Sequence, residues 1–114
     1  MTECIFCRIA GGEIPAQRVD ETAHVLAFRD LQPQAPTHVL LIPREHVAGS
    51  AAELGAPHAG LLGELFGLAA RIAEREGLER GWRLVTNVGP DGGQSVAHLH
   101  FHLLGGRAMT WPPG

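Results

Sequence analysis

The chain has 114 residues, 9 Lys and Arg against 12 Asp and Glu, and a hydrophobic fraction of 45%. The net charge of -3 lacks the basic footprint of a nucleic-acid-binding protein, and the composition is not that of a disordered chain. No apolar run reaches the roughly 18 residues of a membrane helix, and the N-terminus has no signal-peptide pattern. We therefore expect one globular domain, residues 1–114, in the cytoplasm, with neither a membrane nor nucleic acid as partner.

The first half of the chain predicts one short helix and three strands. The helix has one or two turns and is stopped by Gly11 and Gly12. A polar turn separates the first two strands, and Pro43 ends the third because it cannot donate to a sheet ladder. The predicted segments, helix first, are residues 4–9, 17–19, 25–29 and 38–42.

The second half of the chain predicts one long helix and two further strands. The helix covers about residues 58–76, where apolar side chains recur at helical spacing, and Gly77 provides a cap. The strands cover residues 82–88 and 98–104, with the glycine-rich loop 89–93 between them. These elements predict an α+β fold in which the long helix covers one face of an antiparallel sheet of about five strands.

We expect the chemistry of the chain to lie in residues 98–104. Imidazole alternates there with large apolar side chains, which fits only the two-residue period of an extended strand. The apolar side chains Leu99, Phe101 and Leu103 should face the core. The imidazoles should line up on the opposite face, within reach of solvent or a ligand; they are His98, His100 and His102.

Three interpretations of the histidine row compete. The imidazoles could be half-exposed surface groups, ligands of a catalytic metal, or a nucleophile with its supporting groups. A metal site is awkward, since alternate strand residues lie roughly 6 to 7 Å apart and three in a row share one ion poorly. The preceding loop favours the nucleophile, because its glycines let backbone N–H groups converge on an anion, although Pro-Asp-Gly-Gly is also ordinary turn chemistry. Asn87, Gln94 and Ser95 add neutral donors beside that loop.

Cys4 and Cys7 form a Cys-X-X-Cys pair near the N-terminus. A redox role would need a thioredoxin-like βαβ unit, which the predicted elements do not supply. A structural zinc site would need two further ligands, for which His46 and His98 are the candidates. Zinc is the favoured interpretation, and thiols that hold no metal are the alternative.

The stretch 98–104 resembles the histidine triad (HIT) family, whose motif is His-x-His-x-His-x-x with apolar x. The segments 91–96 and 104–107, together with the terminal Trp-Pro-Pro-Gly, resemble the Hint branch of that family. Upstream, residues 27–38 also match the branch pattern. The similarity runs from about Ile5 to Gly114, which is nearly the whole chain.

This resemblance implies a nucleotide hydrolase that cleaves the P–N bond of purine nucleoside phosphoramidates, such as adenosine 5′-phosphoramidate or aminoacyl adenylates. His100 would attack the α-phosphorus and carry a covalent nucleotidyl intermediate, and water would release AMP or GMP. The chemistry itself would need no cofactor. The family also implies a homodimer with sheets joined edge to edge, and structural zinc in many bacterial members, here on Cys4, Cys7, His46 and His98.

Further roles carry over from the family pattern. The phosphate would be held by Asn87, Gly93, Gln94, Ser95 and His102. The base would lie between Ile9, Phe28 and Leu31. Asp30 would bind the ribose hydroxyls, His38 would lie behind the triad, and Trp111 would lie on the leaving-group side, near the partner's site.

Each assignment has a plain alternative. Ile9 and Phe28 could be core residues, Asp30 an ordinary turn residue, and the Trp111 tail a frayed end. The competing functions are dinucleoside polyphosphate hydrolysis or nucleotidyl transfer, as in other HIT branches, and non-enzymatic nucleotide binding by an adaptor. The C-terminal Trp-Pro-Pro-Gly argues against other branches, and the intact triad argues against an adaptor.

Overall fold

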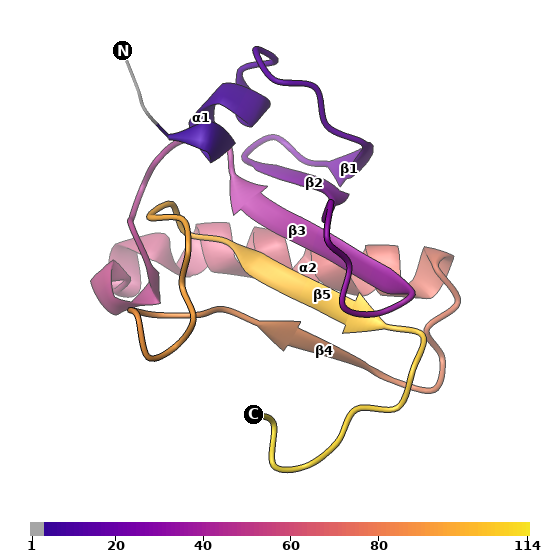
Figure 1. Cartoon of the computed structure of the whole chain (residues 1–114). Coiled ribbons are helices and arrows are strands. Elements are labelled where there is room, and N and C mark those ends of the chain that lie inside the picture. The colour runs from indigo at the N-terminus through magenta and orange to yellow at the C-terminus, as the bar shows by residue number, and fades with distance from the viewer. Residues whose placement is uncertain (1–3) are drawn as a thin grey trace.

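Figure 1 shows the computed structural model, which describes residues 4–114. Within residues 4–114 there are two helices and five strands, and two single 3-10 turns, Ala51–Glu53 and Ala56–His58, lead into the long helix. No helix in the described part of the chain is both long and apolar enough to cross a membrane. The elements are α1 (Ile5–Ala10), β1 (Arg18–Glu21), β2 (Val25–Arg29), β3 (Thr37–Pro43), α2 (Ala59–Arg75), β4 (Trp82–Val85) and β5 (Phe101–Gly105).

The five strands form one antiparallel sheet in the order β1-β2-β3-β5-β4. The central strand β3 is buried at every position, as expected for a strand covered on both faces. Its register pairs His38 with Leu104 and Leu40 with His102. The register therefore brings a histidine of β3 close to the last histidine of the row on β5. The predicted α+β fold, with its five strands and two helices, is confirmed.

Two apolar clusters lie on the two faces of the sheet. The larger one packs under α2, whose buried side chains include Leu65, Leu68 and Ile72. It contains the predicted core positions Leu99, Phe101 and Leu103. The second cluster lies on the other face and is covered by α1, because strand residues alternate between the faces. Its buried members are Phe6, Ile9, Leu26, Phe28, Leu40 and Ile42.

Several boundaries differ from those predicted. β1 runs through the predicted turn to Glu21, because Asp20 pairs with Ala27 of β2 after a register shift and binds Arg71 and Arg75 of α2. β4 ends at Val85 rather than at residue 88, and the hydroxyl of the next residue, Thr86, donates to the His100 carbonyl at 2.8 Å. A side chain thus replaces the ladder at that point.

The end of α2 is close to the predicted one. Gly77 follows the helix with φ +73°, a conformation that costs a side chain energy but costs glycine little. The Leu78 N–H then bonds to the Ala73 carbonyl across the turn at 3.0 Å. This termination directs the chain towards β4 at the edge of the sheet.

Candidate active site and metal centre

The histidine row lies on the sheet face opposite α2, as predicted, but its depth is different. His98 is fully buried and His100 is 5% exposed, so these two rings are closed to solvent, whereas the prediction was that solvent or a ligand could reach all three; their access to a ligand stays a prediction. Only His102 is half-buried. The strand also begins at Phe101, after the first two histidines. His98 and His100 are buried because α1 lies over them and its Phe6 ring packs against both imidazole rings.

The His100 imidazole is fixed by its own chain. Its Nδ1 lies 2.7 Å from the carbonyl oxygen of His98, and a carbonyl can only accept, so Nδ1 carries the proton. In the neutral ring Nε2 then holds the free electron pair. The ring also packs edge-on against His102, with centroids 5.1 Å apart. His100 is therefore oriented as a nucleophile that would react through Nε2.

A second chain of hydrogen bonds fixes the neighbouring ring. The backbone N–H of Gln34 donates to His38 Nδ1 at 3.0 Å, so in neutral His38 the proton is on Nε2. That nitrogen lies 2.9 Å from His102 Nδ1 and 3.4 Å from Asp30 Oδ2. If His38 donates to His102, the proton of neutral His102 lies on Nε2. His102 can then offer an N–H to an anion without being charged.

Burial keeps these two imidazoles neutral. Burial, and after it the neighbouring His100 and His38, lower the pKa of His102 to about 4, while Asp30 acts in the opposite direction. Burial likewise lowers the pKa of His38, and Asp30 again opposes the shift. At neutral pH His100 therefore lies beside two uncharged imidazoles, those of His38 and His102.

Acid is expected to destabilise the fold through His102. Its pKa of about 4 lies below the ordinary 6.5, so the unfolded chain takes up the proton first as the pH falls. The contribution is complete above pH 6.5 and is lost as the pH falls towards 4. Denaturant titrations should show His102 accounting for about 2 kcal/mol between pH 7 and pH 5. The variant His102→Asn should have a flatter profile, and equal pH slopes in the two proteins would contradict this assignment.

Gln94, in the segment before the histidine row, has a different role from the phosphate binding that the sequence predicts. The side-chain amide of Gln94 donates to the carbonyls of Gly49 and Val96, at 2.7 and 2.9 Å, and its oxygen accepts from the Gly89 N–H. Both donors are thus used inside the protein, and Gln94 braces the loop rather than presenting an N–H to a ligand. The tightness of the loop explains one glycine, since a Cβ on Gly92 would lie 2.4 Å from the Val88 oxygen.

The other predicted phosphate groups lie around this loop. Asn87 is half-buried and Ser95 is exposed. Ser95 lines a small hollow of about 250 Å³ that the loop forms with Gly89 and Ala97. Gly93 has φ +84°, which glycine alone adopts readily. The roles of these residues towards a phosphate stay predictions.

The residues predicted to bind the nucleoside, and Trp111 predicted on the leaving-group side, differ in exposure. Ile9 and Phe28 are 7% and 4% exposed within the second cluster and are core residues in this structure. Leu31 and Trp111, in contrast, are 95% and 83% exposed. Asp30 accepts from the Gln32 N–H at 2.7 Å, as expected of an ordinary turn residue, and its other oxygen faces His38. Contacts of all five with a nucleotide stay predictions.

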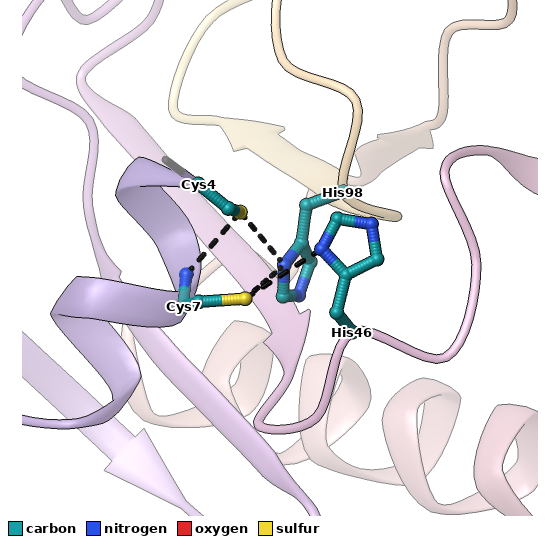
Figure 2. A group of neighbouring side chains, drawn as sticks. All are labelled: Cys4, Cys7, His46 and His98. Carbon is teal, nitrogen blue, oxygen red and sulfur yellow. Dashed lines mark hydrogen bonds between the residues drawn. The ribbon is translucent and has the colours of Figure 1, made fainter. Parts of the chain in front are cut away.

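Figure 2 shows that Cys4, Cys7, His46 and His98 converge. One ligand atom from each lies within 4.8 Å of all the others. The two sulfurs lie 3.2 and 3.5 Å from His98 Nδ1, and the Cys7 sulfur lies 3.5 Å from His46 Nδ1. Zinc bonds of about 2.3 Å to sulfur and 2.05 Å to nitrogen give a tetrahedral S···N edge of about 3.6 Å. The spacing of the donors therefore fits a tetrahedral ion of this size.

The orientation of His98 agrees with this fit. Its Nε2 lies 2.9 Å from the carbonyl oxygen of Pro43, so the proton is on Nε2 and the lone pair of Nδ1 points at the sulfurs. Metal-bound histidines commonly donate their other N–H to a carbonyl in this way. Burial lowers the pKa of His98 and favours the neutral form that binds metals.

A second group of ligand-type residues, Asp30, His38 and His102, also lies within 4.8 Å. It fits a metal poorly. His38 Nδ1 accepts the Gln34 N–H, so Nε2 keeps its proton and has no lone pair for a cation. The hydrogen bonds of His38 instead determine which nitrogens of His38 and His102 carry protons.

Sequence reasoning missed Phe6 and Thr86. Phe6 is three residues from Ile9, and both are buried on one side of α1, a spacing that the sequence does display. Thr86 could not be found in this way, because its contact with the His100 carbonyl depends on the register of β4 against β5.

Comparisons with known proteins agree on one family. The family model described as HIT domain matches residues 11–109. The chain is 52% identical over 112 residues to a 14 kDa zinc-binding protein of Zea mays, and the matched stretch covers 96% of this chain and 87% of that protein. It is 51% identical over 113 residues to an adenylylsulfatase of Arabidopsis thaliana, and the matched stretch covers 96% of this chain and 76% of that protein. The crystal structure of a HIT family hydrolase from Legionella pneumophila has a TM-score of 0.94 at 53% identity, covering 98% and 100%.

Proposed function

The chain belongs to the HIT domain family, and on that premise we propose that it hydrolyses the P–N bond of purine nucleoside phosphoramidates. The observation that carries the proposal is the bond between His100 Nδ1 and the His98 carbonyl. With Nδ1 carrying the proton, Nε2 is the ring atom whose electron pair can attack. A nitrogen nucleophile held in this way suits covalent transfer of a nucleotidyl group.

The reaction would proceed in two displacements. In the first, the Nε2 electron pair forms a bond to the α-phosphorus, the P–N bond breaks, and its electron pair leaves with the nitrogen, which takes a proton from solvent and is released as the amine. In the second, a water oxygen bonds to phosphorus and gives a proton to solvent, the bond to Nε2 breaks with its electron pair returning to the imidazole, and the nucleoside monophosphate is released. The N–H of His102, fixed by His38, would stabilise the charge that grows on the phosphate oxygens.

We further propose that Cys4, Cys7, His46 and His98 hold a structural zinc ion. The tetrahedral spacing of their donors and the orientation of His98 support this. A relative of 52% identity is named a zinc-binding protein. When bound, the ion would fix the N-terminal segment against the sheet, and the reaction uses no step through it.

A homodimer is the proposed assembly. β4 is an edge strand, which presents unpaired backbone groups to a second sheet. Phe66 on α2 and Trp82 on β4 are 51% and 41% exposed, and large apolar side chains open to solvent favour a partner surface. Trp111 would then lie near the partner's site. A solution mass equal to one 12.2 kDa chain would contradict this assembly.

A second candidate function is the hydrolysis of adenylyl sulfate, which the adenylylsulfatase relative favours. Sulfate would replace the amine as leaving group, and the nucleophile and the intermediate would be the same. The two functions therefore differ only on the leaving-group side.

Turnover of three substrates decides between these functions. We expect kcat/KM for adenosine 5′-phosphoramidate to exceed that for adenosine 5′-phosphosulfate and for a diadenosine polyphosphate by at least about tenfold, a difference of about 1.4 kcal/mol in the barrier. Release of AMP is the measurement. A higher kcat/KM for the phosphosulfate would favour the second candidate. Binding of AMP without turnover of any substrate would indicate an adaptor.

A further inference from the structure

Phe6 lies where the candidate metal centre and the candidate nucleophile meet. Its ring packs edge-on against His98, with centroids 5.8 Å apart, and against His100, with centroids 5.0 Å apart. A third edge contact, at 5.9 Å, joins it to Phe28 in the second cluster. One buried ring thus touches the metal-centre histidine, the nucleophile and a residue proposed to bind the base.

The cysteines determine where this ring lies. Phe6 stands between Cys4 and Cys7 on α1, a helix of only six residues that is too short to be stable by itself. The Cys4 sulfur caps the helix by accepting the Cys7 N–H at 3.4 Å. Both sulfurs face His98, so an ion bound there would tie α1 to the sheet. Such an ion would therefore also hold the segment that carries Phe6.

His98 connects the same two places through its backbone. Its ring belongs to the metal centre, whereas its carbonyl oxygen accepts the Nδ1–H of His100 at 2.7 Å. A rotation of His98 would therefore move the acceptor that sets the tautomer of the nucleophile. Two separate contacts therefore link the metal centre to His100: the ring contact through Phe6 and the hydrogen bond from His100 to the His98 carbonyl.

We propose that Phe6 is a positioning residue which, together with His98, couples metal binding at Cys4, Cys7 and His46 to the orientation of His100. The proposal rests on the proposed function, since it concerns the nucleotide site of that reaction. Because coupling is reciprocal, a nucleotide that orders His100 and Phe28 must also strengthen metal binding. Zinc and a purine nucleotide should therefore hold each other in place.

Release of zinc to a chromophoric chelator tests this coupling without using activity. AMP at saturating concentration is expected to slow zinc release from the full chain at least about fivefold. In Phe6→Leu, which keeps an apolar side chain but removes the ring, release should be faster and should respond to AMP less than about twofold. The matched control is Ile72→Val, a small truncation in the cluster on the opposite sheet face, which should behave like the unaltered chain.

A kinetic measurement separates positioning from folding. Phe6→Leu should lower kcat for adenosine 5′-phosphoramidate about tenfold and change KM less than about threefold, because a misplaced nucleophile affects the reacting complex more than binding. Ile72→Val should keep both constants.

The outcomes distinguish this inference from the proposed function. Calorimetry establishes AMP binding independently. AMP that binds without slowing zinc release, or Phe6→Leu that keeps the full AMP effect, would overturn the coupling and leave the proposed function standing. Active protein that contains no zinc would also overturn the coupling alone. Absence of both AMP binding and turnover would contradict the proposed function itself.

Discussion

His100→Ala should lower the turnover of adenosine 5′-phosphoramidate by at least about 10⁴-fold, the size of effect seen when a covalent route is removed. Alanine has no electron pair to attack phosphorus, and the His102 N–H, which belongs to a neutral imidazole, is a hydrogen-bond donor rather than a nucleophile. The measurement is AMP release, followed over hours for the variant. AMP binding should change far less, because the phosphate donors and the nucleoside-binding residues remain.

A rapid quench into alkali, in which a phosphorus–nitrogen bond to histidine survives, tests the same residue more directly. Rapidly mixed wild-type protein should carry a covalent adduct with the mass of one nucleotidyl group, and His100→Ala should carry none. His24→Asn is the matched control: this histidine has a side chain 68% exposed and bonds to Glu64, far from the triad in sequence. It should retain full activity and the adduct. An adduct on His100→Ala, or activity within tenfold of wild type, would exclude His100 as the nucleophile.

The sequence predicted the face of the histidine row because side-chain alternation in an extended segment is local. Leu99, Phe101 and Leu103 are buried against α2, as the two-residue period requires. Depth is not local. His98 and His100 are buried because α1, more than 85 residues away in the chain, packs across them, and no period in the sequence records that contact. The face of the row was thus easier to predict than its burial.

The same distinction explains Gln94. Its place in a glycine-rich loop before the triad indicated a phosphate donor, which is a statement about residue type. Its two N–H groups instead bond to the carbonyls of Gly49 and Val96. The Gly49 carbonyl belongs to the segment after β3, so only the folded chain shows that these donors are already used. Chemical type predicts what a side chain can do, and packing decides which of its groups are available.

The metal centre shows what spacing alone can predict. Two cysteines three residues apart are close in any helix or turn, so Cys4 and Cys7 could be paired from the sequence. His46 and His98 were candidates by chemical type, and the structure brings both to the sulfurs. Their approach depends on β3 and on the path of the loop into β5, which sequence patterns did not determine.

Removal of zinc should lower the thermal midpoint by roughly 15 °C. An ion present at about a thousand times its Kd stabilises the folded state by about 4 kcal/mol, and each kcal/mol shifts a domain of this size by about 4 °C. The segment most affected is α1, whose buried side chains Phe6 and Ile9 complete the second cluster. Calorimetric scans of metal-loaded protein before and after chelation provide the measurement, with the metal content of each sample determined by mass spectrometry.

Matched variants separate the ion from the packing. His46 is exposed, so His46→Ala removes a ligand without opening a cavity and should lower the midpoint of the loaded protein by several degrees. His24→Ala, also exposed, removes an imidazole outside the cluster and should leave the effect of chelation unchanged. Cys4→Ser combined with Cys7→Ser should make the midpoint insensitive to chelator, because serine hydroxyls do not replace thiolates as zinc ligands. A chelator shift below about 2 °C in the unaltered chain, or an equal shift in the double variant, would mean that these four residues do not stabilise the fold through a metal.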